Sequence, residues 1–315
     1  MDSTLPQDLT ALPYWVGDWC LHQLGSHPVQ LLMTTNQMSQ VIGLRLENGQ
    51  CVVVKARPDP QKRALTCLAV QRLLADNGFP CAKPLTDVSF NQGLAIHAEQ
   101  WHPGGEMLRG DDPSVAAAYA HLYSQLMAIT ESISLPPPLP NPEWVHWDHE
   151  GEGFFAPNSR HDAQSARVRL PEELIQVAAR ARRRLLSGKD FLRVLGHADW
   201  EAQNLRWQGT EPYAVHDWDS VAWLPEAALV GAAAGSFAST EIPTLAPLQS
   251  SAAFLSCYEE SHGRHFHAEE RELAWAASLW PALHNARCEV LYDLPRVAYT
   301  ALMAQSEERL RLAGV

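Results

Sequence analysis

The chain has 315 residues, of which 46% are hydrophobic, and its formal net charge at pH 7 is −12. This length exceeds what one hydrophobic core comfortably supports, so two lobes are expected, with enough apolar residues to fill both. The net negative charge argues against general nucleic-acid binding, which requires basic patches, and it is compatible with a small cationic substrate.

The amino terminus and the cysteines indicate the compartment. The first residues, MDSTLPQDLT, do not combine a basic stretch with an apolar run, so a secretory signal is not expected. No window approaches the ~18 uncharged apolar residues that a membrane-spanning helix needs. The cysteines are scattered without paired spacing, at positions 20, 51, 67, 81, 257 and 288, as is typical of reduced thiols. We therefore expect a cytoplasmic protein that does not bind a membrane.

The amino-terminal third is predicted to form a small sheet. Residues 1–30 are expected to form a helix and a turn, and strands fill about 30–56, where the Asn-Gly at 48–49 favours a tight hairpin turn. The second strand of this hairpin ends at Lys55 after an apolar run. A lysine that ends a strand is more often a solvated edge charge, but a lysine in this position can also bind phosphate. The preceding loop, residues 34–39, is not glycine-rich, and Ser39 is one of its candidates for a polar contact with phosphate.

Beyond this hairpin the elements are expected to alternate. The pattern predicts a helix over residues 61–77 and strands over 80–85 and 94–101. A hinge containing Pro-Gly-Gly is expected over 100–105, followed by an amphipathic helix over 113–130. The carboxy-terminal part is expected to be mostly helical, with breaks at prolines.

The segment from His197 to Asp219 carries the strongest functional signal. It contains a His-x-Asp-x4-Asn pattern, GHADWEAQN, and then HDWD after a second short strand. A GTEP turn joins the two strands, and the returning strand leads to Asp217. Such a hairpin is expected to bring Asp199, Asn204 and Asp217 together at one end of a small sheet. Carboxylate and amide oxygens suit Mg²⁺, which also shares its coordination shell with phosphate.

Phosphoryl transfer explains why these residue types are needed. The protein mainly positions the reactants and neutralises charge in such a reaction. Asp199 can orient the attacking hydroxyl and accept its proton, while Asn204 and Asp217 can hold metal ions. Short acidic loops after strands often only cap turns or helices, but the ordered set of residues favours a functional role.

Together these residues resemble the aminoglycoside phosphotransferase and choline kinase-like superfamily, the small-molecule branch of the protein-kinase fold, over roughly residues 30–240. HADWEAQN and HDWD carry the resemblance most specifically, and VVVKAR supports it. The resemblance implies an α+β, two-lobed protein-kinase-like fold. Residues 1–100 would form a small nucleotide-binding lobe with an antiparallel sheet and one helix. Residues 101–315 would form a larger, mainly helical lobe with the catalytic loop, metal site and acceptor pocket.

The resemblance also implies roles for single residues of the second lobe. Asp199 would be the catalytic base, and Asn204 and Asp217 would be metal ligands. Asp219 would be the second acid of the Asp-x-Asp pattern, close to the metal.

In the first lobe, Lys55 would be the phosphate-binding lysine, and Ser39 is a further candidate for nucleotide binding. The backbone near Glu99 and Trp101 would bind the adenine. The implied cofactor is Mg²⁺, with ATP or GTP as co-substrate. The implied partner is a small hydroxylated molecule, and no nucleic acid or membrane is expected.

The sequence departs from the family pattern in three places. The helix over 61–77 lacks an acid before Asp76, so the glutamate that usually pairs with the lysine is missing. Gln71 could serve as a neutral partner, or another segment could supply the charge. Ala198 replaces the usual glycine between the His and the Asp, and Glu226 is the nearest acid to a further expected aspartate.

Three functions follow from these observations. The first is a kinase that phosphorylates a hydroxyl of a small metabolite or antibiotic. The alternative is a pseudokinase-like module that binds nucleotide or another ligand without phosphoryl transfer, which the missing helix glutamate favours. The third is a metal-dependent phosphohydrolase, which would not need Lys55.

The carboxy-terminal region is expected to shape the acceptor pocket. Candidates for its lining are Trp275, Trp280, Glu289, Tyr292 and Asp293. A histidine tract over 262–267 lacks a cysteine or acid at ligand spacing, so a solvated turn is expected there rather than a zinc site.

Overall fold

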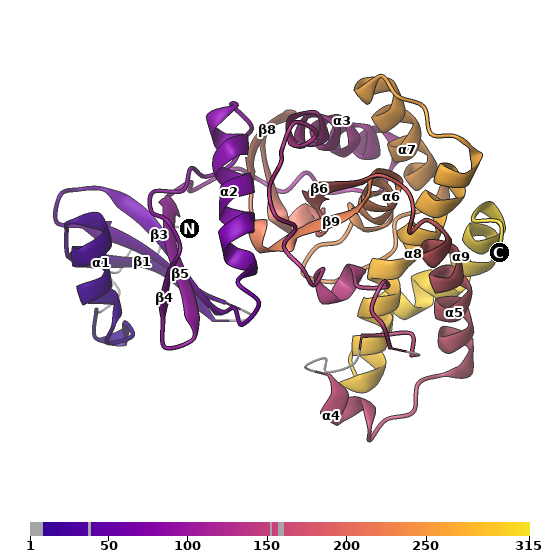
Figure 1. Cartoon of the computed structure of the whole chain (residues 1–315), viewed down its shortest axis with the longest axis horizontal. Coiled ribbons are helices and arrows are strands. Elements are labelled where there is room, and N and C mark those ends of the chain that lie inside the picture. The colour runs from indigo at the N-terminus through magenta and orange to yellow at the C-terminus, as the bar shows by residue number, and fades with distance from the viewer. Residues whose placement is uncertain (1–8, 37–38, 152, 157–160) are drawn as a thin grey trace. The chain divides into compact units, whose positions relative to one another are not determined.

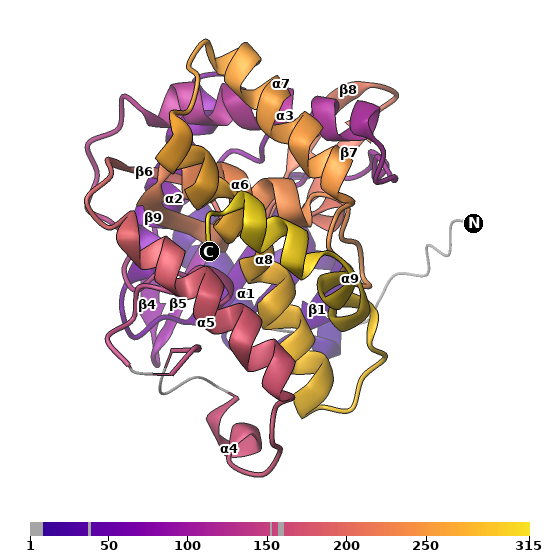
Figure 2. The same cartoon turned by 90° about the vertical axis from the view of Figure 1, so that its right-hand side faces the viewer.

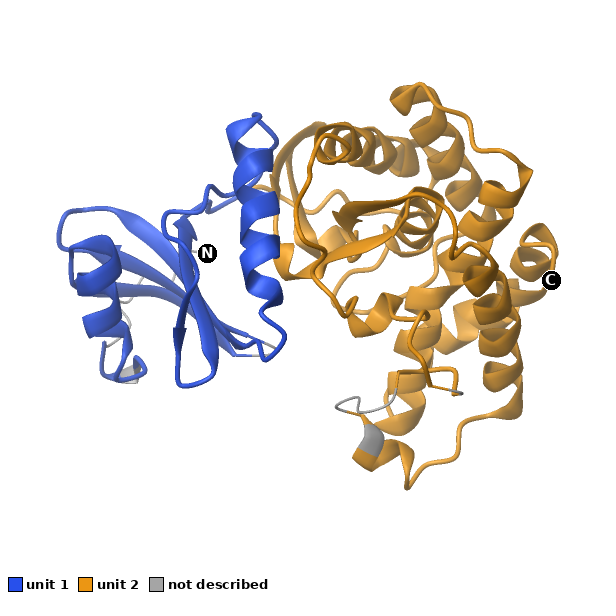
Figure 3. Ribbon diagram, viewed as in Figure 1, with its two compact units in different colours: residues 1–104 blue, residues 105–315 orange. Residues whose placement is uncertain are grey.

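A computed structural model describes residues 9–36, 39–151, 153–156 and 161–315 of the chain. The chain divides into two compact units, residues 1–104 and residues 105–315, here called the amino-terminal unit and the carboxy-terminal unit (Figure 3). The first contains an antiparallel sheet and the second is mainly helical, which confirms the predicted α+β class. In the described ranges, no helix is long and apolar enough to cross a membrane.

The amino-terminal unit, as far as it is described, is built on a five-stranded antiparallel sheet with the order β1-β2-β3-β5-β4 (Figure 1). The strands are β1 (Pro28–Asn36), β2 (Gln40–Leu46), β3 (Cys51–Pro58), β4 (Ser89–Asn91) and β5 (Leu94–Gln100). The predicted β2–β3 hairpin is confirmed, and Gly49 supplies the positive φ, 85°, of its turn. The chain over 34–36 belongs to β1 rather than to a loop.

The predicted strand over 80–85 is wrong. This segment contributes only an isolated bridge between Pro84 and Glu99. The strand that precedes β5 is β4, over Ser89–Asn91. Proline lacks the N–H that a ladder requires, and prolines stand at positions 80 and 84 of this segment.

Helices cover both faces of this sheet. A short 3₁₀ helix η1 (Leu9–Ala11) precedes α1 (Val16–Leu24), and α2 (Arg63–Asp76) follows β3. Trp19 of α1 packs with Ile42 and Val54 in the apolar cluster on one face. Gln71 of α2 binds Glu99 on the opposite face, and Figure 1 shows α1 and α2 on the two sides of the sheet. Alternation along the strands therefore separates an apolar face from a face that carries charged side chains.

The carboxy-terminal unit combines helices with two small sheets. Its helices are α3 (Pro113–Thr130), η2 (Glu143–Val145), α4 (Asp162–Ser165), α5 (Glu172–Ser187), η3 (Ala202–Asn204), η4 (Trp218–Ser220), α6 (Glu226–Ser236), α7 (Leu248–His262), α8 (Ala268–Leu291) and α9 (Val297–Leu312). Its strands are β6 (Arg193–His197), β7 (Leu205–Gln208), β8 (Glu211–Val215) and β9 (Val221–Pro225). β6 pairs with β9, and β7 pairs with β8 through the predicted turn at Gly209.

Close contact between α6 and α8 organises the core of this unit. Every residue of α6 after Glu226 is buried, which explains why the helix is apolar all round. A Cβ added at Gly231 or at Gly235 would lie 2.1 Å or 2.0 Å from a backbone carbonyl oxygen of α8. The two glycines, four residues apart, therefore let the helix backbones touch. On the other side of α8, α5 and α9 pack against it (Figure 2).

Candidate active site

Lys55 and Glu99 form a buried ion pair in the amino-terminal unit. In the register of β3 and β5, Val53 lies opposite Glu99 and Lys55 lies opposite His97. Lys55 and Glu99 are therefore diagonal neighbours on one face of the sheet. The Lys55 Nζ lies 2.9 Å from Glu99 Oε1, and the two side chains are only 13% and 4% exposed.

Gln71 binds the second oxygen of the Glu99 carboxylate. Its Nε2 donates to Glu99 Oε2 at 2.8 Å and to the carbonyl of Ala82 at 2.8 Å. Burial by itself would raise the pKa of Glu99, but Lys55, His97 and the Gln71 hydrogen bond together lower it. The acid that is missing from the helix is thus supplied by β5, and the helix contributes a neutral amide that orients it. The sequence raised both possibilities separately, and the structure combines them.

Glu99 and Trp101 occupy different environments at the end of this sheet. The Glu99 backbone lies inside the sheet, between Val53 and Pro84, and Trp101 is the first residue beyond β5. A Cβ at Gly43 would lie 2.5 Å from Cζ3 of Trp101, so this glycine allows the indole to pack directly on β2.

Ser39 stands immediately before β2 and is half-buried. The two residues before it, 37 and 38, lie outside the described residues. Its predicted contact with nucleotide stays a prediction.

His197 anchors the predicted catalytic loop of the carboxy-terminal unit. Its Nε2 lies 3.0 Å from the carbonyl oxygen of His216, and its Nδ1 accepts the backbone N–H of Asp199 at 3.2 Å. Burial lowers the pKa of His197 to about 4, so the ring is neutral at pH 7. His197 therefore supports the loop through backbone contacts.

The backbone around Ala198 is also fixed. Tyr123 donates its hydroxyl to the carbonyl of His197 at 2.9 Å, and Trp144 donates its indole N–H to the carbonyl of Ala198 at 3.0 Å. The Ala198 N–H donates to Ser220 at 2.9 Å, while its methyl group is buried. The loop therefore accommodates alanine where the family pattern has glycine.

Asn204 holds Asp199 in place. Its Nδ2 donates to the Asp199 carbonyl at 3.0 Å and to Asp199 Oδ2 at 2.8 Å. The first bond closes the loop across five residues, and the second orients the carboxylate. Because Nδ2 points toward Asp199, Oδ1 is the atom of this amide that could coordinate a cation.

Asp217 follows β8 in a left-handed conformation, with φ at 61° and ψ at 50°. A left-handed conformation is uncommon for a residue with a side chain and is often found at functional sites. Its Oδ2 accepts the hydroxyl of Ser220 at 3.2 Å. Asp219 lies two residues further on in η4 and is half-buried.

Three carboxylates in this region interact electrostatically. Burial raises the pKa of Asp199 well above its ordinary range, and the negative charge of Asp217 raises it further. Burial and the charge of Asp199 likewise raise the pKa of Glu201, whose Oε2 accepts a hydrogen bond from Gln203 at 2.7 Å. Glu201 was not predicted from the sequence as a site residue. Its place between Asp199 and Asn204 in the motif was the available signal.

This donor set fits a divalent cation. Carboxylate and amide oxygens are hard ligands of the kind that Mg²⁺ binds. Without a cation, the mutual repulsion of Asp199, Glu201 and Asp217 favours protonation, and a bound cation would relieve it. Asp217 and Asn204 are the residues best suited to hold it, and Asp219 is close enough to influence His197 electrostatically.

Several residues predicted to line the acceptor pocket are buried or are bound to other residues of the carboxy-terminal unit. Trp275 and Trp280 are buried, at 9% and 1% exposure. The carboxylate of Glu289 accepts the backbone N–H groups at the start of α9, so this residue serves as a helix cap. Tyr292 binds His161 through its hydroxyl, at 2.7 Å from Nδ1.

The histidine tract over 262–267 lies at the junction of α7 and α8, and His265 and His267 are exposed, as expected of a solvated turn. His267 caps α8 by accepting the N–H of Glu270, and His262 contacts Glu131 at 2.8 Å.

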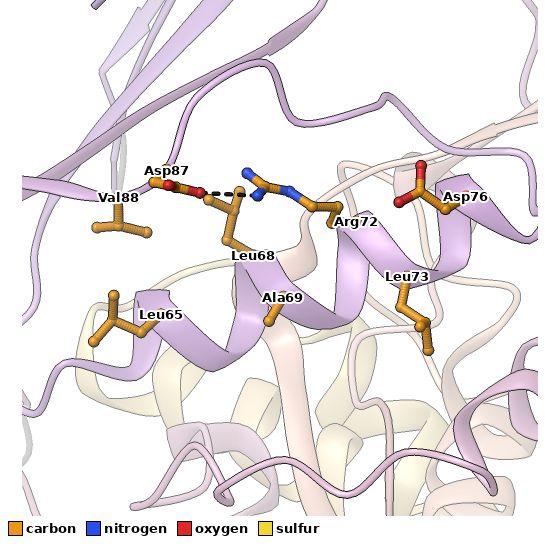
Figure 4. A pocket seen from close by; sticks show the side chains of 8 residues that line it. All are labelled: Leu65, Leu68, Ala69, Arg72, Leu73, Asp76, Asp87 and Val88. Atoms are coloured by element: carbon orange, nitrogen blue, oxygen red, sulfur yellow. Dashed lines mark hydrogen bonds and ion pairs between the residues drawn. The ribbon is translucent and has the colours of Figure 1, made fainter.

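A groove on α2 is lined by other residues. It has a volume of about 460 Å³, and the Arg72–Asp87 ion pair, 2.8 Å long, spans one side of it (Figure 4). The lining residues are Leu65, Leu68, Ala69, Arg72, Leu73, Asp76, Asp87 and Val88. They include none of the predicted site residues, so the groove is not assigned to the active site.

The family is decided by a match to the model of the phosphotransferase enzyme family (APH), which covers residues 36–259. The chain belongs to this family. The match includes Lys55 and the whole segment from His197 to Asp219, and it confirms the resemblance that these motifs indicated. A search of curated proteins by sequence gave no match.

Solved structures confirm the fold of this phosphotransferase. The amicoumacin kinase hAmiN in complex with AMP-PNP, Ca²⁺ and Ami has a TM-score of 0.60 and 12% identity, with 89% of this chain and 88% of that chain covered. A thermostable mutant of aminoglycoside phosphotransferase APH(4)-Ia, in complex with ADP and hygromycin B, has a TM-score of 0.56 and 15% identity over 96% and 99%. Spectinomycin phosphotransferase APH(9)-Ia with ADP and spectinomycin has a TM-score of 0.53 and 13% identity over 95% and 99%.

Proposed function

We propose that this phosphotransferase is an ATP-dependent kinase that transfers the γ-phosphoryl group to a hydroxyl of a small molecule. The observation that carries the proposal is the carboxylate of Asp199, oriented by Asn204 at 2.8 Å and close enough to Asp217 for their charges to interact. The adenine nucleotides in the similar structures, AMP-PNP and ADP, favour ATP over GTP.

Asp199 acts as the general base. The acceptor oxygen forms a bond to the γ-phosphorus, the bond between this phosphorus and the β,γ-bridging oxygen breaks, and ADP leaves. The hydroxyl proton passes to an Asp199 carboxylate oxygen. Its raised pKa favours this transfer, because a more basic carboxylate accepts a proton more readily. Asn204 positions the side chain of this base, and the neutral His197 positions its backbone.

Lys55 binds the nucleotide phosphates, with Glu99 and Gln71 holding its ammonium group in position. Ser39 contributes a polar contact to the phosphates, and the backbone from Trp101 onwards binds the adenine, since Glu99 lies inside the sheet.

Asp217 and Asn204 hold Mg²⁺, and Asp219 supports their position. When bound, the cation neutralises phosphate charge during transfer. The acceptor is a small hydroxylated molecule, and the net charge of −12 favours a cationic one through electrostatic attraction.

Thermal unfolding with ATP, GTP and ADP, each with and without Mg²⁺, tests the nucleotide site. Ligands that bind the native state raise the melting temperature by mass action. We expect ATP with Mg²⁺ to raise the melting temperature of the wild type. The rise in Asp217→Asn and in Lys55→Met, each measured against the same variant without ligand, should be smaller. An absence of any nucleotide-dependent shift in the wild type would refute the proposal.

A further inference from the structure

Two histidines and a cysteine meet at the carboxy-terminal end of α8. His161 stands immediately before α4, and His284 and Cys288 lie four residues apart on one side of α8. The Cys288 Sγ lies 3.8 Å from Nε2 of His161 and 3.8 Å from Nε2 of His284. All three donor atoms lie within 4.8 Å of one another, and both histidines are buried.

We propose that His161, His284 and Cys288 form a zinc site. Zinc binds thiolate at about 2.3 Å and imidazole nitrogen at about 2.0–2.1 Å in tetrahedral geometry. These bond lengths require a sulfur–nitrogen separation of roughly 3.6 Å, and the two observed separations of 3.8 Å are close to it. A ligand set with one thiolate and two imidazoles selects zinc over Mg²⁺ or Ca²⁺, which prefer oxygen.

The surroundings of His161 support this assignment. Its Nδ1 lies 2.7 Å from the Tyr292 hydroxyl, so the ring is held with Nε2 directed toward Cys288. Histidines that bind zinc commonly use the second ring nitrogen in such a contact, which fixes their orientation. Tyr292 directly follows α8, so one end of this helix supplies two ligands and the group that orients the third.

Glu143 lies beside His161 but does not belong to the group of three donors. Its Oε1 lies 3.8 Å from Nε2 of His161, on the side of η2. Arg287 lies next to Glu143: its Nη1 is 3.6 Å from the same Glu143 oxygen, and its Nη2 donates to Ser165 at 2.9 Å. The guanidinium also lies over the ring of Phe155, at 4.4 Å. Its charge is therefore paired with the Glu143 carboxylate. A water molecule would take the fourth position.

A zinc ion here would attach α4 to α8. His161 and Cys288 are separated by 127 residues, and Gln164 of α4 already donates to the carbonyl of Leu291 at 2.8 Å. Zinc that binds the native state and not the unfolded chain stabilises the native state by mass action, to an extent set by the free zinc concentration. The zinc site shares no residue with Asp199, Asn204 and Asp217, so it does not depend on their proposed catalytic role.

Zinc content tests the proposal directly. The full chain, loaded with zinc and dialysed without nucleotide, is analysed by plasma mass spectrometry for wild type, Cys288→Ser, His284→Gln, Cys257→Ser and Asp217→Asn. We expect about one zinc per chain in the wild type. Cys288→Ser and His284→Gln should lose it, whereas Cys257→Ser, a control at another half-buried cysteine, and Asp217→Asn should retain it.

A second measurement uses the wild type alone, in case the ligand variants fold poorly. Cobalt(II) bound to a thiolate gives a charge-transfer band in the near ultraviolet, and bound metal should protect Cys288 from alkylation at least tenfold. Absence of retained zinc in the wild type, or retention in Cys288→Ser, would overturn the proposal. So would a cobalt complex without the thiolate band, or equal alkylation of Cys288 with and without metal.

Discussion

Lys55 and Glu99 satisfy each other's charge across two neighbouring strands, with 2.9 Å between Nζ and Oε1. The glutamate comes from β5, and the helix that usually supplies it contributes Gln71 instead. The lysine is therefore fixed without an acidic residue in α2, so the missing helix glutamate does not by itself indicate an inactive protein.

Replacing one member of this pair should destabilise the protein strongly. Lys55→Met leaves the Glu99 carboxylate buried without its counter-charge, which costs about 3–5 kcal/mol in comparable pairs. Urea unfolding should show this loss, and Lys55→Met combined with Glu99→Gln should recover part of it because no buried charge remains. Nucleotide binding should stay weak in the double variant. A single variant as stable as the wild type would contradict the buried pair.

His149 should make the protein sensitive to acid. Burial, then the charge of Arg182, whose Nη2 lies 3.4 Å from Nδ1, lowers the pKa of His149 to about 4. A histidine in the unfolded chain has a pKa of about 6.5. Between these values the unfolded state binds more protons than the native state, so this contribution to stability falls as the pH drops from about 6.5 to about 4.

His149→Gln should reduce this loss. The measurement is the melting temperature of wild type and variant between pH 7 and pH 4.5, with the exposed His265→Gln as control. We expect a shallower decrease in His149→Gln alone. His197, whose pKa is lowered in the same way, accounts for a remaining slope. Identical slopes for wild type and His149→Gln would show that His149 is not buried in its neutral form.

The contact of α6 with α8 predicts an effect of adding one methyl group. In Gly235→Ala the new Cβ would lie 2.0 Å from the carbonyl oxygen of Ser278, so the helices must separate. Overpacking of this kind typically costs about 1–3 kcal/mol. Gly17→Ala is the matched control, because this helical glycine has open space around it. It should stabilise α1 by up to about 1 kcal/mol, as measured by chemical unfolding. If Gly235→Ala left the free energy of unfolding unchanged, the close contact would be contradicted.

Asn204→Ala should affect catalysis more than stability. It removes both hydrogen bonds to Asp199 and an oxygen that could bind Mg²⁺. Positioned acid–base groups contribute about 10²–10⁴-fold, so turnover should fall by at least 10²-fold. Gln208→Ala, which removes an exposed amide from the neighbouring strand, should be nearly neutral. Turnover within a few-fold of wild type in Asn204→Ala would argue against the assigned role.

Local patterns predicted much of the fold. The hairpins at Gly49 and Gly209 follow from turn chemistry, which acts over a few residues. The spacing from His197 to Asn204 likewise identified a loop that is closed by the local hydrogen bonds of Asp199 with His197 and Asn204.

Contacts between distant segments could not be predicted in the same way. The pairing of Lys55 with Glu99 depends on the register of β3 and β5, and the approach of His161 to Cys288 depends on helix packing. The burial of Glu201, which raises its pKa, also depends on the folded environment. The i, i+4 spacing of His284 and Cys288 was visible, but nothing local pointed to His161.

Phosphoryl transfer itself is the decisive test of the proposed kinase activity. The wild type is incubated with ATP, Mg²⁺ and a panel of hydroxylated small molecules, and phosphorylated products are detected by mass spectrometry. We expect a phosphorylated product with at least one acceptor, and about 10²–10⁴-fold less with Asp199→Asn, while the nucleotide-dependent rise in melting temperature persists in that variant. Equal product formation by Asp199→Asn and the wild type would contradict the role proposed for Asp199. Release of inorganic phosphate at a rate that is the same with and without acceptor and the same in Lys55→Met would contradict the kinase activity.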